Sequence, residues 1–181
     1  MAAAPTSSSA PLASLDRVHA ARAVAGELGV DLLVVTPGSD LRYLCGYSAH
    51  AMERLTALAV PRRGEPFLVV PRLEAPMVDA SPAGGLGLEV LAWDETDDPF
   101  ARLAAAVTAR LGAAPVRVAV GARTWAEHAL GVQRAVPGAT LELASPVVDR
   151  LRMVKTPAEV RSEEHTSELQ SPCNLVCRLL L

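Results

Sequence analysis

An α/β domain is the fold class that the sequence predicts, with a mixed β-sheet of about five or six strands flanked by helices. Short apolar runs, of the kind that form strands buried on both faces, recur along the chain. Between several of these runs, apolar residues recur at helical spacing. The first predicted helix, 15–28, leads directly into the first apolar run, 32–35, and this succession is typical of a layered α/β domain.

Strands are expected where a short apolar run is bounded by turn residues, namely at 32–35, 55–60, 66–70, 88–92, 116–120 and 140–143. The second and third runs are joined by a short polar connection with proline and glycine, which predicts an antiparallel hairpin. Residues 84–87 read G-G-L-G, but they precede a strand instead of joining a strand to a helix. A flexible turn is therefore expected there in preference to a phosphate-binding loop.

Helices are expected at 15–28, 72–80, 100–111 and 124–136. Ser14 is suited to cap the first of them, and Gly29 is suited to end it. Asp98 and Pro99 open the third helix in the favoured order, with an acid before a proline in the first turn. Thr124 is predicted to cap the fourth helix.

The composition excludes several classes of protein. The 17 basic and 20 acidic residues leave a net charge of −3, which argues against nucleic-acid binding because that function needs clustered positive charge. No run of apolar residues is long enough to cross a membrane, and residues 1–14 lack the basic and apolar regions of a signal peptide. Three cysteines, an odd number, do not indicate a disulfide framework, so a cytoplasmic location is expected.

The composition changes abruptly after Val160. Residues 161–181 contain neither alanine nor glycine. Residues 161–171 match, without a mismatch, the in-frame translation of a common short-read sequencing adapter, and residues 174–181 match its continuation beyond the sample index. We therefore expect 161–181 to be an adapter-derived artefact and exclude it from the interpretation of the fold.

One polar stretch, 40–54, is not readily explained by structure alone. It places two tyrosines, a histidine and an arginine on the connection that leaves the first buried strand. The ends of such strands are where α/β domains hold ligand contacts. The alternative is structural: Tyr43 and Tyr47 pack, and Arg54 pairs with Glu53 or another surface acid. The residues themselves leave both interpretations open.

Residues 1–160 carry no recognisable catalytic or metal-binding motif. There is no Ser-His-Asp spacing, G-x-S-x-G turn, H-E-x-x-H sequence or pair of closely spaced cysteines. Cys45 is expected to be a buried, unreactive thiol, and His19 and His128 to be surface or packing residues of helices. The acids at 94–98 precede a helix, which favours solvated capping over cation binding.

Several motifs occur in an order that resembles the N-terminal domain of the creatinase, prolidase and aminopeptidase P family. These motifs are the run 31–36 followed by Asp40-x-x-Tyr43-Leu44-x-Gly46-Tyr47, the strand end 69–74, and Leu151-Arg152-x-Val154-Lys155-Thr156-Pro157-x-Glu159. The resemblance covers about residues 12–161 and implies a mixed-sheet domain with flanking helices. The expected organisation is then a disordered leader at 1–11, an accessory domain at 12–150, and a linker with the start of a catalytic domain at 151–160.

In that family a catalytic domain of the pita-bread fold follows and binds a pair of manganese, cobalt or zinc ions. The resemblance implies that this chain contains none of those metal ligands, binds no cofactor itself and has no peptidase activity alone. The intact parent is then a Xaa-Pro aminopeptidase or dipeptidase that cleaves short proline-containing peptides. Two alternatives stay open: a creatinase-like amidinohydrolase, and a stand-alone α/β module for binding or oligomerisation.

The resemblance also implies a role for the domain itself. In the family it pairs subunits into homo-oligomers and, in some members, sends a loop to the rim of a neighbouring active site. The stretch 47–54 matches the position of that loop, which makes Tyr47, His50 and Arg54 the candidate rim residues. Of these, His50 and Arg54 are expected to meet a substrate carboxylate or its water shell.

Overall fold

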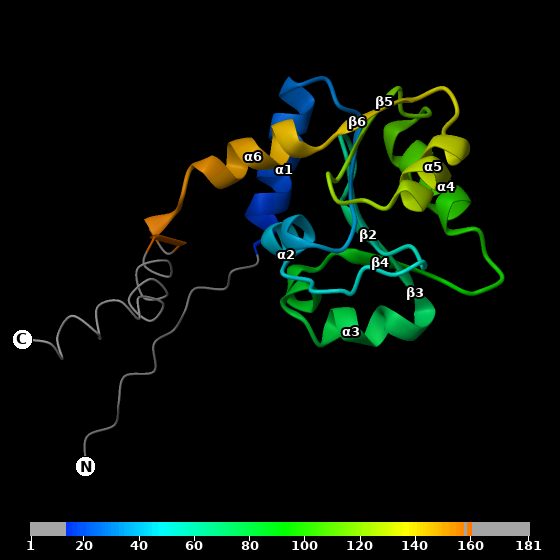
Figure 1. The fold of residues 1–181 in the computed structure, drawn as a ribbon, viewed down its shortest axis with the longest axis horizontal. Coiled ribbons are helices and arrows are strands. Elements are labelled where there is room, and N and C mark those ends of the chain that lie inside the picture. Colours follow the sequence, from blue (N-terminus) through cyan, green and yellow to red (C-terminus); the bar gives the residue numbers. More distant parts are fainter. Residues whose placement is uncertain (1–13, 158, 161–181) are drawn as a thin grey trace, which may run out of the picture. The chain divides into compact units, whose positions relative to one another are not determined.

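A six-stranded sheet with helices on both faces organises the computed structural model, which describes residues 14–157, 159 and 160 (Figure 1). Described residues up to Leu151 belong to one compact unit, and those from Arg152 onward belong to a second. The strands are β1 (Leu32–Val35), β2 (Ala57–Pro61), β3 (Phe67–Pro71), β4 (Glu89–Trp93), β5 (Arg117–Val120) and β6 (Thr140–Leu143). The helices are α1 (Leu15–Glu27), α2 (Ser39–Cys45), α3 (Ala75–Asp79), α4 (Pro99–Leu111), α5 (Ala126–Ala135) and α6 (Ser145–Met153), with 3₁₀ turns η1 (Arg72–Glu74) and η2 (Pro82–Leu86).

The sheet is mixed, as predicted, with the strand order β4-β3-β2-β1-β5-β6. Strands β2 and β3 form the predicted antiparallel hairpin, in which Ala57 lies opposite Val69. Strand β2 is also antiparallel to β1, whereas β1–β5, β5–β6 and β3–β4 are parallel pairs. Five strands therefore end at one edge of the sheet, where β2 begins, and we call this the carboxyl edge.

Alternate residues of the central strands supply two separate cores. On β1, Leu33 and Val35 pack with residues of α1, α2 and α6, while Leu32 and Val34 pack with residues of α4 and α5. Figure 1 shows α1 and α4 on opposite sides of the sheet. Every residue of β1, β2 and β3 is buried, which explains why these strands read as continuous apolar runs.

The predicted caps are confirmed for the first and third helices. The Ser14 side chain accepts a hydrogen bond from the Asp16 N–H at 3.1 Å. The Asp98 carboxylate accepts from the N–H groups of Phe100 and Ala101 at 2.9 and 3.1 Å. In each case a side-chain oxygen satisfies an N–H that has no partner within the helix.

Thr124 does not cap α5, so that prediction is wrong. The Thr124 N–H donates to the Gly121 carbonyl at 2.9 Å, and this turn directs the side chain toward the end of β1. There the two hydroxyls of Thr124 and Thr36 share a hydrogen bond of 2.9 Å. Helix α5 begins only after Trp125, without a side-chain cap.

Helices α2 and α6 were not predicted. Helix α2 has seven residues, too few for a clear helical period, and its buried residues include Leu41 and Leu44. It ends at Gly46, whose φ of 75° lies in the left-handed region that favours glycine. A flexible turn was expected in the glycine-rich segment before β4. The structure instead has a 3₁₀ turn there, η2.

In the second unit, Thr156 and Glu159 form the start of a helix. The Glu159 carboxylate accepts hydrogen bonds from the N–H and hydroxyl of Thr156 at 2.8 and 2.9 Å, and the Glu159 N–H donates back to the Thr156 hydroxyl at 3.3 Å. This reciprocal arrangement is a capping box.

Among the described helices, none has the length and apolar character required to cross a bilayer. The expectations for 1–11 and 161–181 lie outside the described residues.

Replacing Gly131 with alanine should destabilise the domain by about 1–3 kcal/mol, because a β-carbon there overpacks the α4–α5 contact. That carbon would lie 2.5 Å from ring carbons of Phe100. The matched control is Gly26→Ala in α1, where an added β-carbon meets nothing within 4 Å. Urea denaturation should show the control equal to or more stable than the wild type, since alanine is the better helix former. Equal effects of the two substitutions would contradict the proposed clash.

Candidate functional site

The three candidate residues lie on the loop between α2 and β2. After Gly46 the chain forms neither helix nor strand until β2 begins at Ala57. Because β2 begins at the carboxyl edge, the loop reaches the edge where β1, β3, β4, β5 and β6 end. The sequence therefore located the polar segment correctly, although its first residues form α2.

Tyr47 is a packed residue. It is 1% exposed, and its hydroxyl has no hydrogen-bond partner among the described residues. Burial, followed by the nearby charge of Glu74, raises the pKa of Tyr47 above its ordinary value. The tyrosine hydroxyl is therefore neutral at physiological pH, and its ring is part of the core on the α1 face.

Arg54 is paired with two acids from other elements. Its Nη1 lies 3.2 Å from Glu95 Oε1, and its Nη2 lies 3.6 Å from Glu74 Oε1. Glu74 also accepts a hydrogen bond from the Thr56 hydroxyl at 3.4 Å. The structural interpretation correctly expected an acidic partner, but the partners are not the adjacent Glu53. Glu74 thus interacts with Arg54 directly and with Tyr47 through its charge.

His50 lies on the exposed part of the same loop. Ser48, His50 and Ala51 are exposed, whereas Leu55 and Thr56 at the end of the loop are buried. No hydrogen bond or ion pair joins His50 to Tyr47 or Arg54 in the part of the chain that the structure describes. The structure therefore brings Tyr47 and Arg54 near the same acid, Glu74, and leaves His50 exposed at the surface.

Two buried rings hold the end of this loop. The Trp93 Nε1–H donates to the Leu55 carbonyl at 2.9 Å, and His128 Nε2 lies 3.0 Å from the Glu53 carbonyl oxygen. Because a carbonyl oxygen only accepts, His128 must carry its proton on Nε2 in this contact. Sequence reasoning did not assign this role to either residue. The signal available was general: a buried indole or imidazole needs a polar partner.

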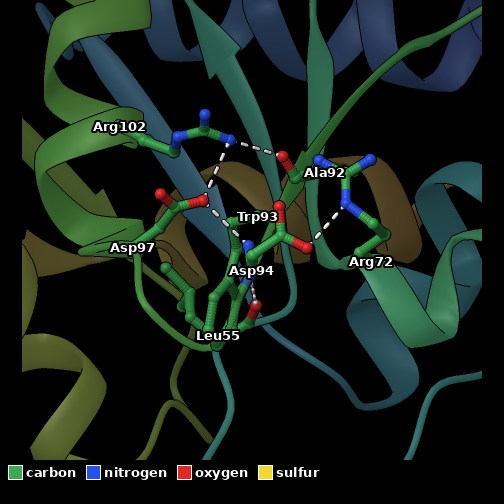
Figure 2. A network of polar contacts seen from close by, with 7 residues as sticks. All are labelled: Leu55, Arg72, Ala92, Trp93, Asp94, Asp97 and Arg102. Atoms are coloured by element: carbon green, nitrogen blue, oxygen red, sulfur yellow. Dashed lines mark hydrogen bonds and ion pairs between the residues drawn. The ribbon is translucent and has the colours of Figure 1, made fainter.

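The acids that precede α4 are engaged by arginines. Arg72 Nε lies 2.6 Å from Asp94 Oδ1 (Figure 2). Arg102 Nη1 lies 3.4 Å from Asp97 Oδ2 and donates to the Ala92 carbonyl at 2.6 Å. The hydrogen bond from Arg72 lowers the pKa of Asp94. Beyond the cap supplied by Asp98, the segment thus forms a surface network that joins β4 to η1 and α4.

Among residues 14–157, 159 and 160, no group of three or more histidine, cysteine, aspartate or glutamate side chains could hold a metal ion. The acids near the loop face arginines instead, as Glu95 faces Arg54 and Asp94 faces Arg72. These contacts orient backbone and loop. They do not place a nucleophile beside a general base, one of the arrangements that activates a side chain for covalent catalysis.

Cys45 is buried, as predicted. Its Sγ lies 3.3 Å from the Leu41 carbonyl oxygen, one turn earlier in α2. Burial raises the pKa of the Cys45 thiol to about 11. Since the thiolate is the nucleophile, this environment disfavours reactivity at neutral pH.

Cys45 should make the stability of the domain fall at alkaline pH. Its pKa is about 11 in the folded chain and 9.0 in the ordinary thiol, so the unfolded chain loses its proton first as the pH rises. The contribution is complete below pH 9 and should be lost progressively up to pH 11, by about 3 kcal/mol in total. Urea denaturation at pH 8, 9, 10 and 11 measures the decline. A Cys45→Ala variant should lack this part of it, and parallel pH profiles for the two proteins would contradict the assignment.

Comparison with known proteins identifies similar sequences and folds. The Creatinase/Prolidase N-terminal domain family matches residues 17–154. The probable dipeptidase PepE of Mycobacterium tuberculosis is 44% identical over 144 residues, which cover 80% of this chain and 37% of that protein. The chain therefore spans well under half the length of this curated relative.

Solved structures show the same relationship. The crystal structure of dipeptidase PepE from Mycobacterium ulcerans matches with a TM-score of 0.75 and 41% identity, over 87% of this chain and 40% of that one. The N-terminal domain of Xaa-Pro dipeptidase from Lactobacillus brevis matches with a TM-score of 0.65 over 77% of this chain and 99% of that one. At 16% identity the second similarity concerns the fold alone.

Proposed function

We infer the function of this chain from its family, because it belongs to the creatinase/prolidase N-terminal domain family. We propose that it is the non-catalytic N-terminal domain of a dipeptidase that hydrolyses short Xaa-Pro peptides. The observation that carries the proposal is the family match over residues 17–154, in a chain that covers 37% of a probable dipeptidase. We propose a cytoplasmic location for the protein.

The described residues do not fit the pair of manganese, cobalt or zinc ions that the family resemblance implies. A metal pair needs several carboxylate or imidazole ligands that converge, and no such group is present among the described residues. The proposal assigns the metal ligands, and the hydrolysis itself, to a catalytic domain of the parent protein.

The loop 47–56 is the part of this domain that we propose contacts substrate. Its end is fixed by Trp93 and His128, and its exposed part carries His50. Arg54 retains a half-buried guanidinium beside two acids, so a substrate carboxylate would compete with Glu95, the more exposed partner. Tyr47 acts by packing beneath the loop. In a homo-oligomer formed through this domain, such a loop can reach a neighbouring subunit.

The experiment uses the protein encoded by the complete gene, assayed with short Xaa-Pro peptides and with creatine. Arg54→Ala should lower kcat/KM for the peptides roughly tenfold, which corresponds to about 1.4 kcal/mol of transition-state stabilisation. Arg63→Ala, which removes an exposed arginine from the β2–β3 connection, is the matched control and should change nothing. Residues 1–181 alone should be inactive.

Unchanged kcat/KM in the Arg54→Ala protein would contradict the loop's role while leaving the family assignment intact. Hydrolysis of creatine in place of peptides would favour the amidinohydrolase. Activity of residues 1–181 alone would overturn the non-catalytic assignment. Urea denaturation of each variant distinguishes lost contacts with substrate from lost folding.

A further inference from the structure

A pocket of about 310 Å³ lies between the end of α2 and the α3–η2 segment. Its volume falls at the lower end of the range of small-molecule sites, about 300–1,000 Å³. It is lined by Arg42, Gly46, Tyr47, Ser48, Met77, Ser81 and Pro82. Sequence reasoning assigned no role to this combination, because the two lining segments are separated by about thirty residues in the chain.

The walls of the pocket are preformed. Tyr47, one of the lining residues, is buried, and Ser81 is held by two hydrogen bonds within its own segment. The Ser81 hydroxyl donates to the Val78 carbonyl at 2.7 Å and accepts from the Ala83 N–H at 3.2 Å. The Ser81 hydroxyl is therefore engaged in holding the wall of the pocket. Met77 is 50% exposed and offers a flexible thioether that adapts to an apolar ligand.

Arg42 supplies the charge of the pocket, since the other lining residues carry none. Its side chain is exposed and makes no ion pair or hydrogen bond to any residue that the structure describes. Arg54 and Arg72, on neighbouring parts of the same unit, are both paired with acids. A free guanidinium beside an apolar wall predicts an anionic group on the ligand, and its planar donors match the two oxygens of a carboxylate.

We propose that this pocket binds a small monocarboxylate with an apolar body. The apolar part packs against Tyr47, Met77 and Pro82, the carboxylate meets Arg42, and the exposed Ser48 hydroxyl is available as a second donor. A cationic ligand is disfavoured because no acid lines the pocket. The pocket shares Tyr47 and Ser48 with the loop 47–56, but the inference does not rest on the proposed function, because it concerns binding by this domain alone and requires no peptide hydrolysis.

The test uses ¹⁵N-labelled residues 1–181 and two probes, 3-phenylpropanoate and its neutral amide, in an NMR titration. The acid should shift the amide signals of Ser48 and Met77 with a Kd on the order of 1 mM, as expected for a ligand of this size. The amide should bind at least tenfold more weakly. Arg42→Gln should weaken binding of the acid fivefold to tenfold, whereas Arg63→Gln, the matched control, should leave it unchanged.

Equal binding of the acid and the amide by the wild-type protein would overturn the proposal without recourse to any variant. The proposal also fails if the acid causes no shifts at millimolar concentration, or causes shifts only at residues outside the pocket. Unchanged binding in the Arg42→Gln protein, with the wild-type spectrum otherwise preserved, would show that the guanidinium does not select the ligand.

Discussion

Replacing Trp93 with alanine is expected to lower the free energy of unfolding by about 4 kcal/mol. Trp93 ends β4 and is only 6% exposed, so the substitution opens a large cavity in the core on the α4–α5 face. It also removes the donor to the buried Leu55 carbonyl. Urea denaturation followed by circular dichroism measures the loss.

Trp93→Phe separates the two contributions. It keeps most of the apolar volume but leaves the Leu55 carbonyl without its partner, which should cost about 1–3 kcal/mol. Hydrogen exchange should then accelerate at the backbone amides of residues 53–56, next to the lost contact. A Trp93→Phe protein with wild-type stability and wild-type exchange would contradict the role of the indole in holding the loop.

Replacing Phe67 with alanine is expected to cost a similar amount, about 3–5 kcal/mol. Phe67 is fully buried at the start of β3 and belongs to the same core as Leu103 and Val107 of α4. The Arg110 guanidinium lies over its ring, 4.2 Å from the ring centre. The substitution thus removes both apolar packing and a cation–π contact.

The control for this position is Phe67→Leu, which retains an apolar side chain in the core. It should recover most of the lost stability and leave a deficit of about 1 kcal/mol from imperfect packing and the missing ring. Thermal and urea denaturation should rank the proteins as wild type, Phe67→Leu, Phe67→Ala. Unlike Trp93→Phe, Phe67→Leu should not accelerate exchange selectively in the loop, because Phe67 donates no hydrogen bond to it.

The sequence by itself determined most of the secondary structure. Buried strands need apolar side chains on both faces, so β1, β2 and β3 could be recognised as continuous runs. The caps at Ser14 and Asp98 depend on residues within one helical turn, which is why they were predictable. Short helices such as α2 have too few turns to show a helical period in the sequence. The failure of the cap predicted at Thr124 has a tertiary cause, because its hydroxyl shares a hydrogen bond with Thr36, eighty-eight positions away.

Some features of the candidate site were likewise predictable from the sequence, and others were not. The sequence located the polar loop, since residue types and the preceding strand were enough to mark it. Only the tertiary structure decided that Tyr47 is buried and that Arg54 pairs with Glu74 and Glu95. Likewise, Trp93 and His128 reach the loop from 38 and 75 residues away in the chain. Burial and pairing depend on which strands become neighbours, and that is fixed by the packing of the whole sheet, not by local sequence.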